Sequence, residues 1–142
     1  MKGLILPLQT NLKKIMSEIK NILSNIKNDL YFGTNNEKTE SQFFRSSILH
    51  FAISLEIGEG HYKDNPVSFE TICSNIPKKI GSRSSIQNIL NDAVYRGHFV
   101  KVINNKDKRI KQYLYSDKYS KMIFNWLEFQ RNTLNGSKFY KK

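Results

Sequence analysis

Apolar residues near the start of the chain recur at alternating steps of four and three, as on one face of a helix. This spacing predicts a long helix that packs against another helix, either within the chain or from a second subunit. The sequence leaves these two alternatives open. The stripe consists of Leu8, Leu12, Ile15, Ile19, Ile22 and Ile26, widened by Met16, Leu23 and Leu30.

A second apolar segment predicts a central, buried helix over roughly residues 41–57, because its apolar residues cover most of the helix circumference. The polar stretch Gly33–Glu40 is expected to form the loop before it. We expect the sequence GEGHYKDNP, with two glycines and a proline, to end the helix.

The pattern from Val67 onwards predicts two short helices joined by the turn PKKIG. Ser68 is suited to cap the first helix, which would bury Phe69, Ile72 and Ile76. Ser82 is suited to cap the second, and Gly97 to end it in the left-handed conformation. The second helix would bury Ile86, Ile89, Leu90, Ala93 and Val94.

The last part of the chain predicts a β-hairpin followed by a helix. HFVKVI and IKQYLYS have the composition and alternation of strands, and the polar turn NNKDKR separates them. A helix is expected over residues 117–134, with Gly136 ending it and SKFYKK as a basic tail. Its apolar stripe consists of Tyr119, Met122, Ile123, Trp126 and Leu127.

This order of elements predicts one domain over residues 1–142, mainly α with a small β-hairpin (α+β). Residues 67–115 would form a helix-turn-helix with an attached hairpin, which is a winged helix. The N-terminal helices over residues 8–57 and the C-terminal helix over residues 117–134 would frame it and supply the dimer contacts.

Charge changes this picture, because it is unevenly distributed. The chain has 23 Lys and Arg against 12 Asp and Glu, a net charge of +11. Residues 1–70 hold 8 basic and 8 acidic residues, so the whole excess lies in residues 71–142. A strongly basic second half predicts a polyanionic partner. An AT-rich coding sequence would explain many lysines, but not their separation from the acids.

The polar face of the helix that follows Ser82 is suited to the DNA major groove. Small residues at its start permit close approach, and forked polar groups can bond to base edges. No Asp or Glu occurs between Glu70 and Asp92, where an acid would repel the phosphates. The alternative is the ordinary solvated face of an amphipathic helix. The candidate DNA-binding residues here are Ser82, Arg83, Ser84, Ser85, Gln87 and Asn88.

The turn of the hairpin supports the same interpretation. A cationic loop at the tip of a wing can lie along phosphates or insert an arginine into the minor groove. Asp107 could hold the hairpin's shape by pairing with a nearby arginine. A solvated hairpin with ordinary lysines is the alternative. The candidate DNA-binding residues here are Asn105, Lys106, Lys108, Arg109 and Lys111.

Other classes of protein find little support in the sequence. The single cysteine, Cys73, excludes an internal disulfide and a cysteine-based zinc site. His50, His61 and His98 are scattered, and no phosphate-binding loop or nucleophile elbow is present, so we expect no enzyme, metal or cofactor. No stretch is apolar enough for a membrane span or a signal peptide, so we expect an intracellular, cytoplasmic protein.

The segment from Val67 to Tyr119 resembles the winged-helix core of MarR-type transcriptional regulators. The similar stretches are Ser82–Lys101 for the recognition helix, Asp107–Arg109 for the wing tip and Tyr115–Tyr119 for the strand that enters the last helix. Three features depart from the family pattern: the longer turn IPKKIG, Tyr119 where glycine is common, and a short C-terminal helix.

The resemblance implies a homodimer that binds double-stranded DNA at a pseudo-palindromic operator, usually as a repressor, and often a small phenolic or anionic effector. Nothing else in the sequence supports an effector. A non-specific architectural or replication-associated winged helix is the alternative. Contacts between subunits would come from the first and last helices, through Leu12, Ile15, Ile19, Ile22, Ile26 and Trp126.

Overall fold

A computed structural model of the chain describes residues 2–32 and 39–135. Most of the expected loop Gly33–Glu40, the expected helix end at Gly136 and the basic tail lie outside these residues. The described residues form two compact units. We call residues 39–123 the winged-helix unit, and residues 2–32 with 124–135 the helical unit. Because the described residues divide into two units, the assignment of residues 1–142 to a single domain stays a prediction.

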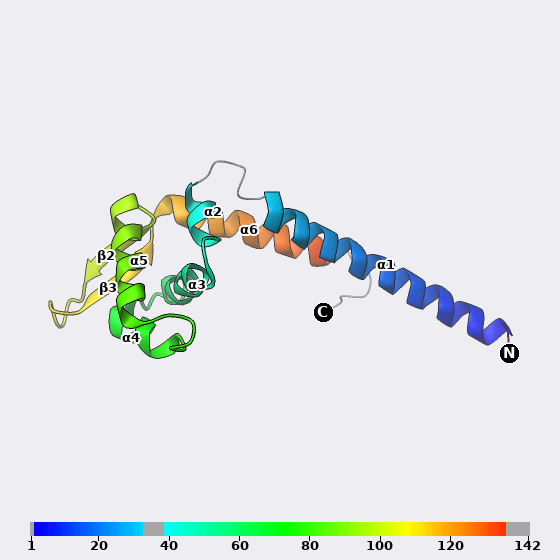
Figure 1. Ribbon diagram of the computed structural model, residues 1–142, viewed down its shortest axis with the longest axis horizontal. Coiled ribbons are helices and arrows are strands. Elements are labelled where there is room, and N and C mark those ends of the chain that lie inside the picture. The colour runs from blue at the N-terminus through cyan, green and yellow to red at the C-terminus, as the bar shows by residue number, and fades with distance from the viewer. Residues whose placement is uncertain (1, 33–38, 136–142) are drawn as a thin grey trace. The chain divides into compact units, whose positions relative to one another are not determined.

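The winged-helix unit has the predicted α+β fold, a helix-turn-helix followed by a β-hairpin. Helix α5 lies beside the hairpin, and α3 and α4 pack in the same unit (Figure 1). The elements are α2 Thr39–Phe44, α3 Ile48–Tyr62, β1 Val67–Ser68, α4 Phe69–Asn75, α5 Arg83–Arg96, β2 Phe99–Ile103, β3 Lys111–Tyr115 and the start of α6 Asp117–Asn135.

The single helix predicted over residues 41–57 is wrong, since α2 and α3 are separate. Ser47 has an extended backbone, with φ −162° and ψ 169°, and its side chain accepts a hydrogen bond from the His50 backbone N–H at 3.1 Å. A serine in this conformation satisfies a free N–H group at a helix start. The break is therefore a new N-cap inside an apolar segment.

The predicted end of the helix near residue 57 is also too early, because α3 continues through Gly58 and Gly60 and ends at Tyr62, inside the segment GEGHYKDNP. A Cβ atom added to Gly58 would lie 2.1 Å from the hydroxyl oxygen of Tyr115. The Tyr115 hydroxyl donates a hydrogen bond to the Ser54 backbone carbonyl at 2.6 Å. Gly58 thus lets a tyrosine approach the helix backbone closely, and this contact outweighs the low helix propensity of glycine.

The sheet contains one strand more than predicted. Its order is β1-β3-β2, and both strand pairs are antiparallel. The predicted hairpin pairs Phe99 with Tyr115 and Ile103 with Lys111. Strand β1 has only two residues and no alternating pattern of its own, so its pairing with β3 is a tertiary feature.

The predicted caps of the helix-turn-helix are confirmed. The side chains of Ser68 and Ser82 accept hydrogen bonds from the backbone N–H groups of Thr71 and Ser85, each at 3.1 Å. Gly97 ends α5 in the left-handed region, with φ 83°. The two serines fix the N-termini of both helices, and Gly97 fixes the C-terminus of the second.

The core of the winged-helix unit combines aliphatic and aromatic side chains. Ile72, Ile86, Leu90 and Ala93 of the two short helices are buried, as predicted, whereas Phe69, Ile89 and Val94 are half-buried. The second part of the core is a cluster of aromatic side chains. It consists of Phe43, His98, Phe99, Tyr115 and Tyr119, and the ring centroids of the contacting pairs lie 4.9–6.2 Å apart.

The helical unit consists of α1, Lys2–Phe32, and the later residues of α6. Helix α1 starts six residues before Leu8, the first residue of the predicted stripe, and continues through Pro7. A proline beyond the first turn removes one backbone hydrogen bond and crowds the carbonyl four residues earlier, so Pro7 is a weak point of α1. No helix among residues 2–32 and 39–135 is long and apolar enough to cross a membrane.

Candidate nucleic-acid interface

The first two turns of α5 present a small, polar surface to solvent. Ser82, Ser84, Ser85 and Asn88 are exposed, and Gln87 is half-buried. The Ser82 and Ser85 hydroxyls are 3.0 Å apart, in addition to the capping bond, so the serines are ordered by the helix start itself. A short, polar helix end of this kind has the shape needed to approach base edges closely.

Gln87 is oriented by two neighbours. Its side-chain Nε2 donates to Asn91 Oδ1 at 2.9 Å, one helical turn further along α5. It also lies near the hydroxyl of Tyr113 on β3, where it partly opposes the rise in the Tyr113 pKa that burial causes. The Gln87 amide thus faces Asn91 and the hairpin, whereas the side chain of the exposed Asn88 makes no hydrogen bond among the described residues.

Arg83, the first residue of α5, is engaged within the protein. Its NH1 and NH2 groups donate to the two carboxylate oxygens of Glu70 at 2.9 and 2.7 Å. Its guanidinium carbon also lies 4.9 Å from the centroid of the Phe69 ring. The hydrogen bond from Arg83 lowers the pKa of Glu70, and the carboxylate raises the pKa of Arg83.

The tip of the wing is built by two side chains that accept backbone hydrogen bonds. Asn104 Oδ1 accepts from the N–H groups of Lys106 and Asp107, at 2.8 and 3.0 Å. Asp107 accepts from the backbone N–H of Arg109 at 3.0 Å and from its Nε and NH2 groups at 3.1 and 3.0 Å. The predicted pairing of Asp107 with an arginine is therefore confirmed.

This geometry presents basic groups at the tip of the hairpin. Arg109 is paired but 90% exposed, and its hydrogen bond lowers the pKa of Asp107. Asn105, Lys106 and Lys108 are exposed as well. Lys111 is exposed, and its Nζ donates to the backbone carbonyl of Lys108 at 3.2 Å. The turn therefore combines a fixed backbone with several cationic groups in solvent.

The sequence interpretation missed the role of Glu70. Glu70 lies thirteen residues before Arg83 and on another helix, a separation that no local period predicts. Phe69 was expected only as a core residue, yet it is half-buried and also contacts the guanidinium. The one available signal was a weak one: Glu70 is the last acid before a long acid-free interval.

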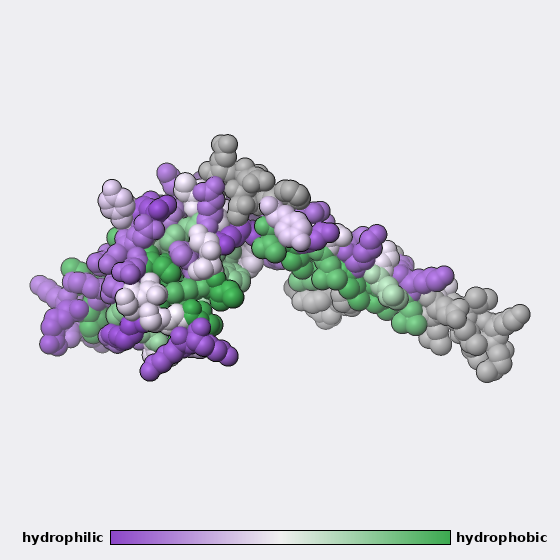
Figure 2. Space-filling view, in the orientation of Figure 1, coloured by the Kyte–Doolittle hydropathy of each residue, from purple (hydrophilic) through white to green (hydrophobic). Residues whose placement is uncertain are grey.

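The residues proposed for dimerisation lie on α1 and α6. Leu12, Ile15, Ile19 and Ile26 are exposed, between 37% and 58%, whereas Ile22 is buried. Trp126 is half-buried. Apolar side chains form a continuous band along α1 (Figure 2). The helical unit thus leaves most of its predicted seam in solvent.

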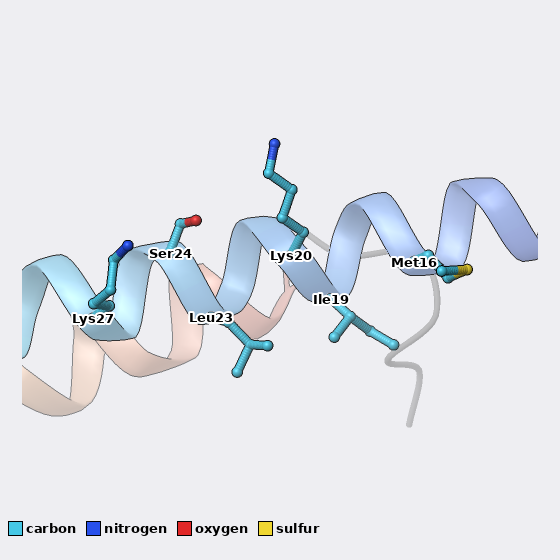
Figure 3. Close-up of a pocket in the computed structure, with 6 residues that line it drawn as sticks. All are labelled: Met16, Ile19, Lys20, Leu23, Ser24 and Lys27. Atoms are coloured by element: carbon cyan, nitrogen blue, oxygen red, sulfur yellow. The ribbon is translucent and has the colours of Figure 1, made fainter.

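A shallow groove also lies along α1. Ile19 and Leu23 project from one side of the helix, and Lys20, Ser24 and Lys27 from the other (Figure 3). These five residues and Met16 line the groove. All six belong to one helix, so the groove is an irregularity of the exposed α1 surface.

The residues weighed as catalytic candidates do not come together as a site. His61 Nδ1 accepts a hydrogen bond from the Tyr115 backbone N–H at 3.1 Å, and His50 bonds with Ser47 near the start of α3. His98 is buried in the aromatic cluster, and Cys73 is half-buried on α4. Within the described part of the chain, no three His, Cys, Asp or Glu side chains could hold a metal ion together.

These elements define a winged helix-turn-helix fold. No protein-family profile and no curated protein match the chain. Among solved structures, it is similar to a putative MarR-like transcription regulator from Bacillus cereus, at 11% identity over 89% of this chain and 84% of that one, with a TM-score of 0.42. It is also similar to the transcriptional regulator SlyA, at 13% identity over 86% and 79%, with a TM-score of 0.44. The fold assignment rests on the elements, sheet and caps above.

Proposed function

We propose that the chain is a sequence-specific, double-stranded-DNA-binding transcription regulator of the MarR type. The observation that carries this proposal is the exposed polar start of α5, whose first two turns contain no acidic residue, next to a hairpin with a basic tip. Helix α5 would enter the major groove, and the wing would lie on the backbone or in the minor groove.

Base recognition would rest on the exposed α5 residues. Asn88 can form paired hydrogen bonds with adenine, and so can Gln87 if it exchanges its bond to Asn91. Ser84 and Ser85 would permit close approach and bond to phosphates or base edges. The wing residues Asn105, Lys106, Lys108, Arg109 and Lys111 would supply contacts that are independent of base identity.

We further propose that two copies bind a two-fold symmetric site and that bound protein represses transcription. The exposed apolar residues of α1 support a dimer, because a contiguous apolar stripe in solvent is typical of an association surface. The heptad spacing of the stripe supports a helix as the partner. A small-molecule effector has no support among the described residues.

Selection from a random duplex-DNA pool at near-physiological salt tests this proposal. Enrichment of a two-fold symmetric site, with half-sites about 10 base pairs apart, would support a dimeric regulator. Binding without enrichment that collapses as salt rises would favour the second candidate, a non-specific architectural protein. The net charge of +11 is the observation that favours this candidate.

The variant Asn88→Ala sharpens the same test. It should cost about 1–3 kcal/mol at particular base pairs of the selected site and leave random-duplex affinity unchanged. Asn65→Ala, which removes an exposed asparagine from the loop before β1, is the matched control. Equal losses for both variants, or no loss for Asn88→Ala, would remove Asn88 from the base-recognising surface.

A further inference from the structure

An acidic side chain lies on the surface that the proposed function assigns to DNA. Glu70 is in the first turn of α4, and Arg83 is the first residue of α5. The fork of the guanidinium meets both oxygens of the carboxylate, at 2.7 and 2.9 Å. Because the Phe69 ring lies 4.9 Å from the guanidinium carbon, Arg83 is restrained from two sides although it remains exposed to solvent.

The Glu70–Arg83 pair joins the first turns of α4 and α5, and this position matters for DNA binding. The N-terminus of a helix carries a partial positive charge and favours an anion, which can be a carboxylate or a phosphate. Glu70 lies in the first turn of α4, a helix of seven residues, so its carboxylate is held chiefly by Arg83. A DNA phosphate that approached the same end of the helix-turn-helix would meet an anion already bound to its most suitable cation.

Carboxylate and phosphate compete for the same face of a guanidinium, since both accept two parallel N–H···O bonds. An arginine already bound to a carboxylate releases no counterion from DNA unless the carboxylate is displaced. Arg109 on the wing differs, because its partner Asp107 is part of the turn and also bonds to the backbone N–H of Arg109. Glu70 makes no bond with the backbone of Arg83 among those described.

We propose that Glu70 masks Arg83 from DNA phosphates and so lowers the affinity of the chain for duplex DNA of any sequence. Arg83 is then a positioning residue that joins the first turns of α4 and α5, and it is not a direct base contact. This inference rests on the proposed function, because it presupposes that the helix-turn-helix faces DNA. This masking of Arg83 by Glu70 limits non-specific binding to DNA by a chain whose second half is otherwise strongly basic.

The experiment measures the affinity of the full chain for a labelled random-sequence duplex over a series of salt concentrations. Glu70→Gln should bind several-fold more tightly, and the slope of log affinity against log salt should steepen by about one unit. Arg83→Ala should leave the salt slope unchanged, since the arginine makes no phosphate contact to lose, and should lower affinity only through the unpaired Glu70 carboxylate. Glu70→Gln combined with Arg83→Ala should match the wild type, because it removes both charges of the pair.

Glu59→Gln is the matched control, because it removes one exposed negative charge from α3, away from the pair. It should leave the salt slope unchanged. Circular dichroism of each variant verifies that the fold is intact. The mask is overturned if Glu70→Gln behaves like Glu59→Gln, if the double variant binds as tightly as Glu70→Gln, or if Arg83→Ala alone loses affinity and flattens the slope. Failure of the wild type to bind any duplex would instead overturn the proposed function, and the mask with it.

Discussion

Similar aliphatic stripes are buried in one unit of the chain and exposed to solvent in the other. In the winged-helix unit, Ile53, Ile72 and Leu90 have no exposed surface. On α1 of the helical unit, Leu12, at 58%, and Leu23, at 60%, are mostly exposed. On α5, the buried residues Ile86, Leu90 and Ala93 follow the same steps of four and three as the α1 stripe, so spacing alone does not tell whether a stripe has a partner within the chain.

The difference separates stability from association. A buried leucine contributes to folding through the apolar area that it removes from water. An exposed stripe contributes nothing of this kind until another surface covers it, and large exposed apolar patches are typical of interaction sites. We therefore expect substitutions in the winged-helix unit to change the free energy of unfolding, and those on α1 to change association.

The largest effect is expected where α5 packs into the core of the winged-helix unit. Leu90→Ala should lower the free energy of unfolding by about 2–5 kcal/mol, because Leu90 is fully buried and its truncation leaves a cavity. Urea denaturation followed by circular dichroism measures the loss. A loss below about 1 kcal/mol would contradict the buried position of Leu90.

The close contact between α3 and β3 should be the next most sensitive feature. Gly58→Ala should cost about 1–3 kcal/mol, because the new Cβ would overlap the Tyr115 hydroxyl group. Alanine is otherwise the better helix former by about 1 kcal/mol, so the sign of the change is diagnostic. Glu59→Ala, the next residue along the same helix, is the control and should be neutral or slightly stabilising. A stabilising Gly58→Ala would show that Tyr115 does not pack against α3.

Acidification should destabilise the winged-helix unit through His98. Its side chain is 2% exposed, and Nε2 has no hydrogen-bond partner in the described structure. Burial is the main cause that lowers the His98 pKa below its ordinary value of 6.5, and Arg96 adds to it, while Glu40 and Asp92 oppose it. As the pH falls, the unfolded chain takes up a proton on His98 before the folded chain does. His98 therefore leaves the free energy of unfolding unchanged above about pH 6.5. Below that pH the free energy of unfolding falls by up to about 1.4 kcal/mol per pH unit, until the pKa of the folded state is reached.

Denaturant midpoints at pH 7.5 and pH 5.0 measure this effect. His98→Phe should reduce the difference between the two midpoints, since it removes the buried titrating group. Burial also lowers the pKa of His50, so His50→Gln is the second variant and should retain most of the difference. A wild-type midpoint that does not fall at pH 5.0 would contradict the prediction for His98.

Features that depend on neighbouring residues were predictable from the sequence. The caps at Ser68 and Ser82 and the left-handed Gly97 follow from short-range hydrogen bonding and from the conformational freedom of glycine. The hairpin follows from two alternating segments around a polar turn. The polar, exposed start of α5 was predictable for the same reason, because its buried and exposed residues alternate with the helical period.

Features that depend on distant residues were not predictable in this way. Gly58 lies inside a helix because Tyr115, from the other end of the winged-helix unit, needs the space. The two-residue β1 exists only through its pairing with β3. Arg83 was expected to face DNA, but its partner Glu70 lies on another helix. In each case the contact that determines the local structure comes from a residue distant in the sequence. A local pattern of residues does not contain that contact.

The smallest effect on folding is expected from a substitution on α1. This substitution tests the comparison between the two units most directly. Leu23→Ala should change the free energy of unfolding of the winged-helix unit by less than about 0.5 kcal/mol, because Leu23 belongs to the helical unit and is 60% exposed. Hydrogen exchange of amides in residues 49–123 should therefore match the wild type.

The same substitution should weaken self-association in sedimentation velocity at micromolar concentration, because it removes apolar area from the proposed dimer contact. Lys14→Ala, on another face of α1, is the matched control and should leave the sedimentation coefficient unchanged. Lower amide protection across residues 49–123 in Leu23→Ala would show that the two units share one core. A wild-type chain that sediments as a monomer would show that the α1 stripe has no partner among copies of this chain.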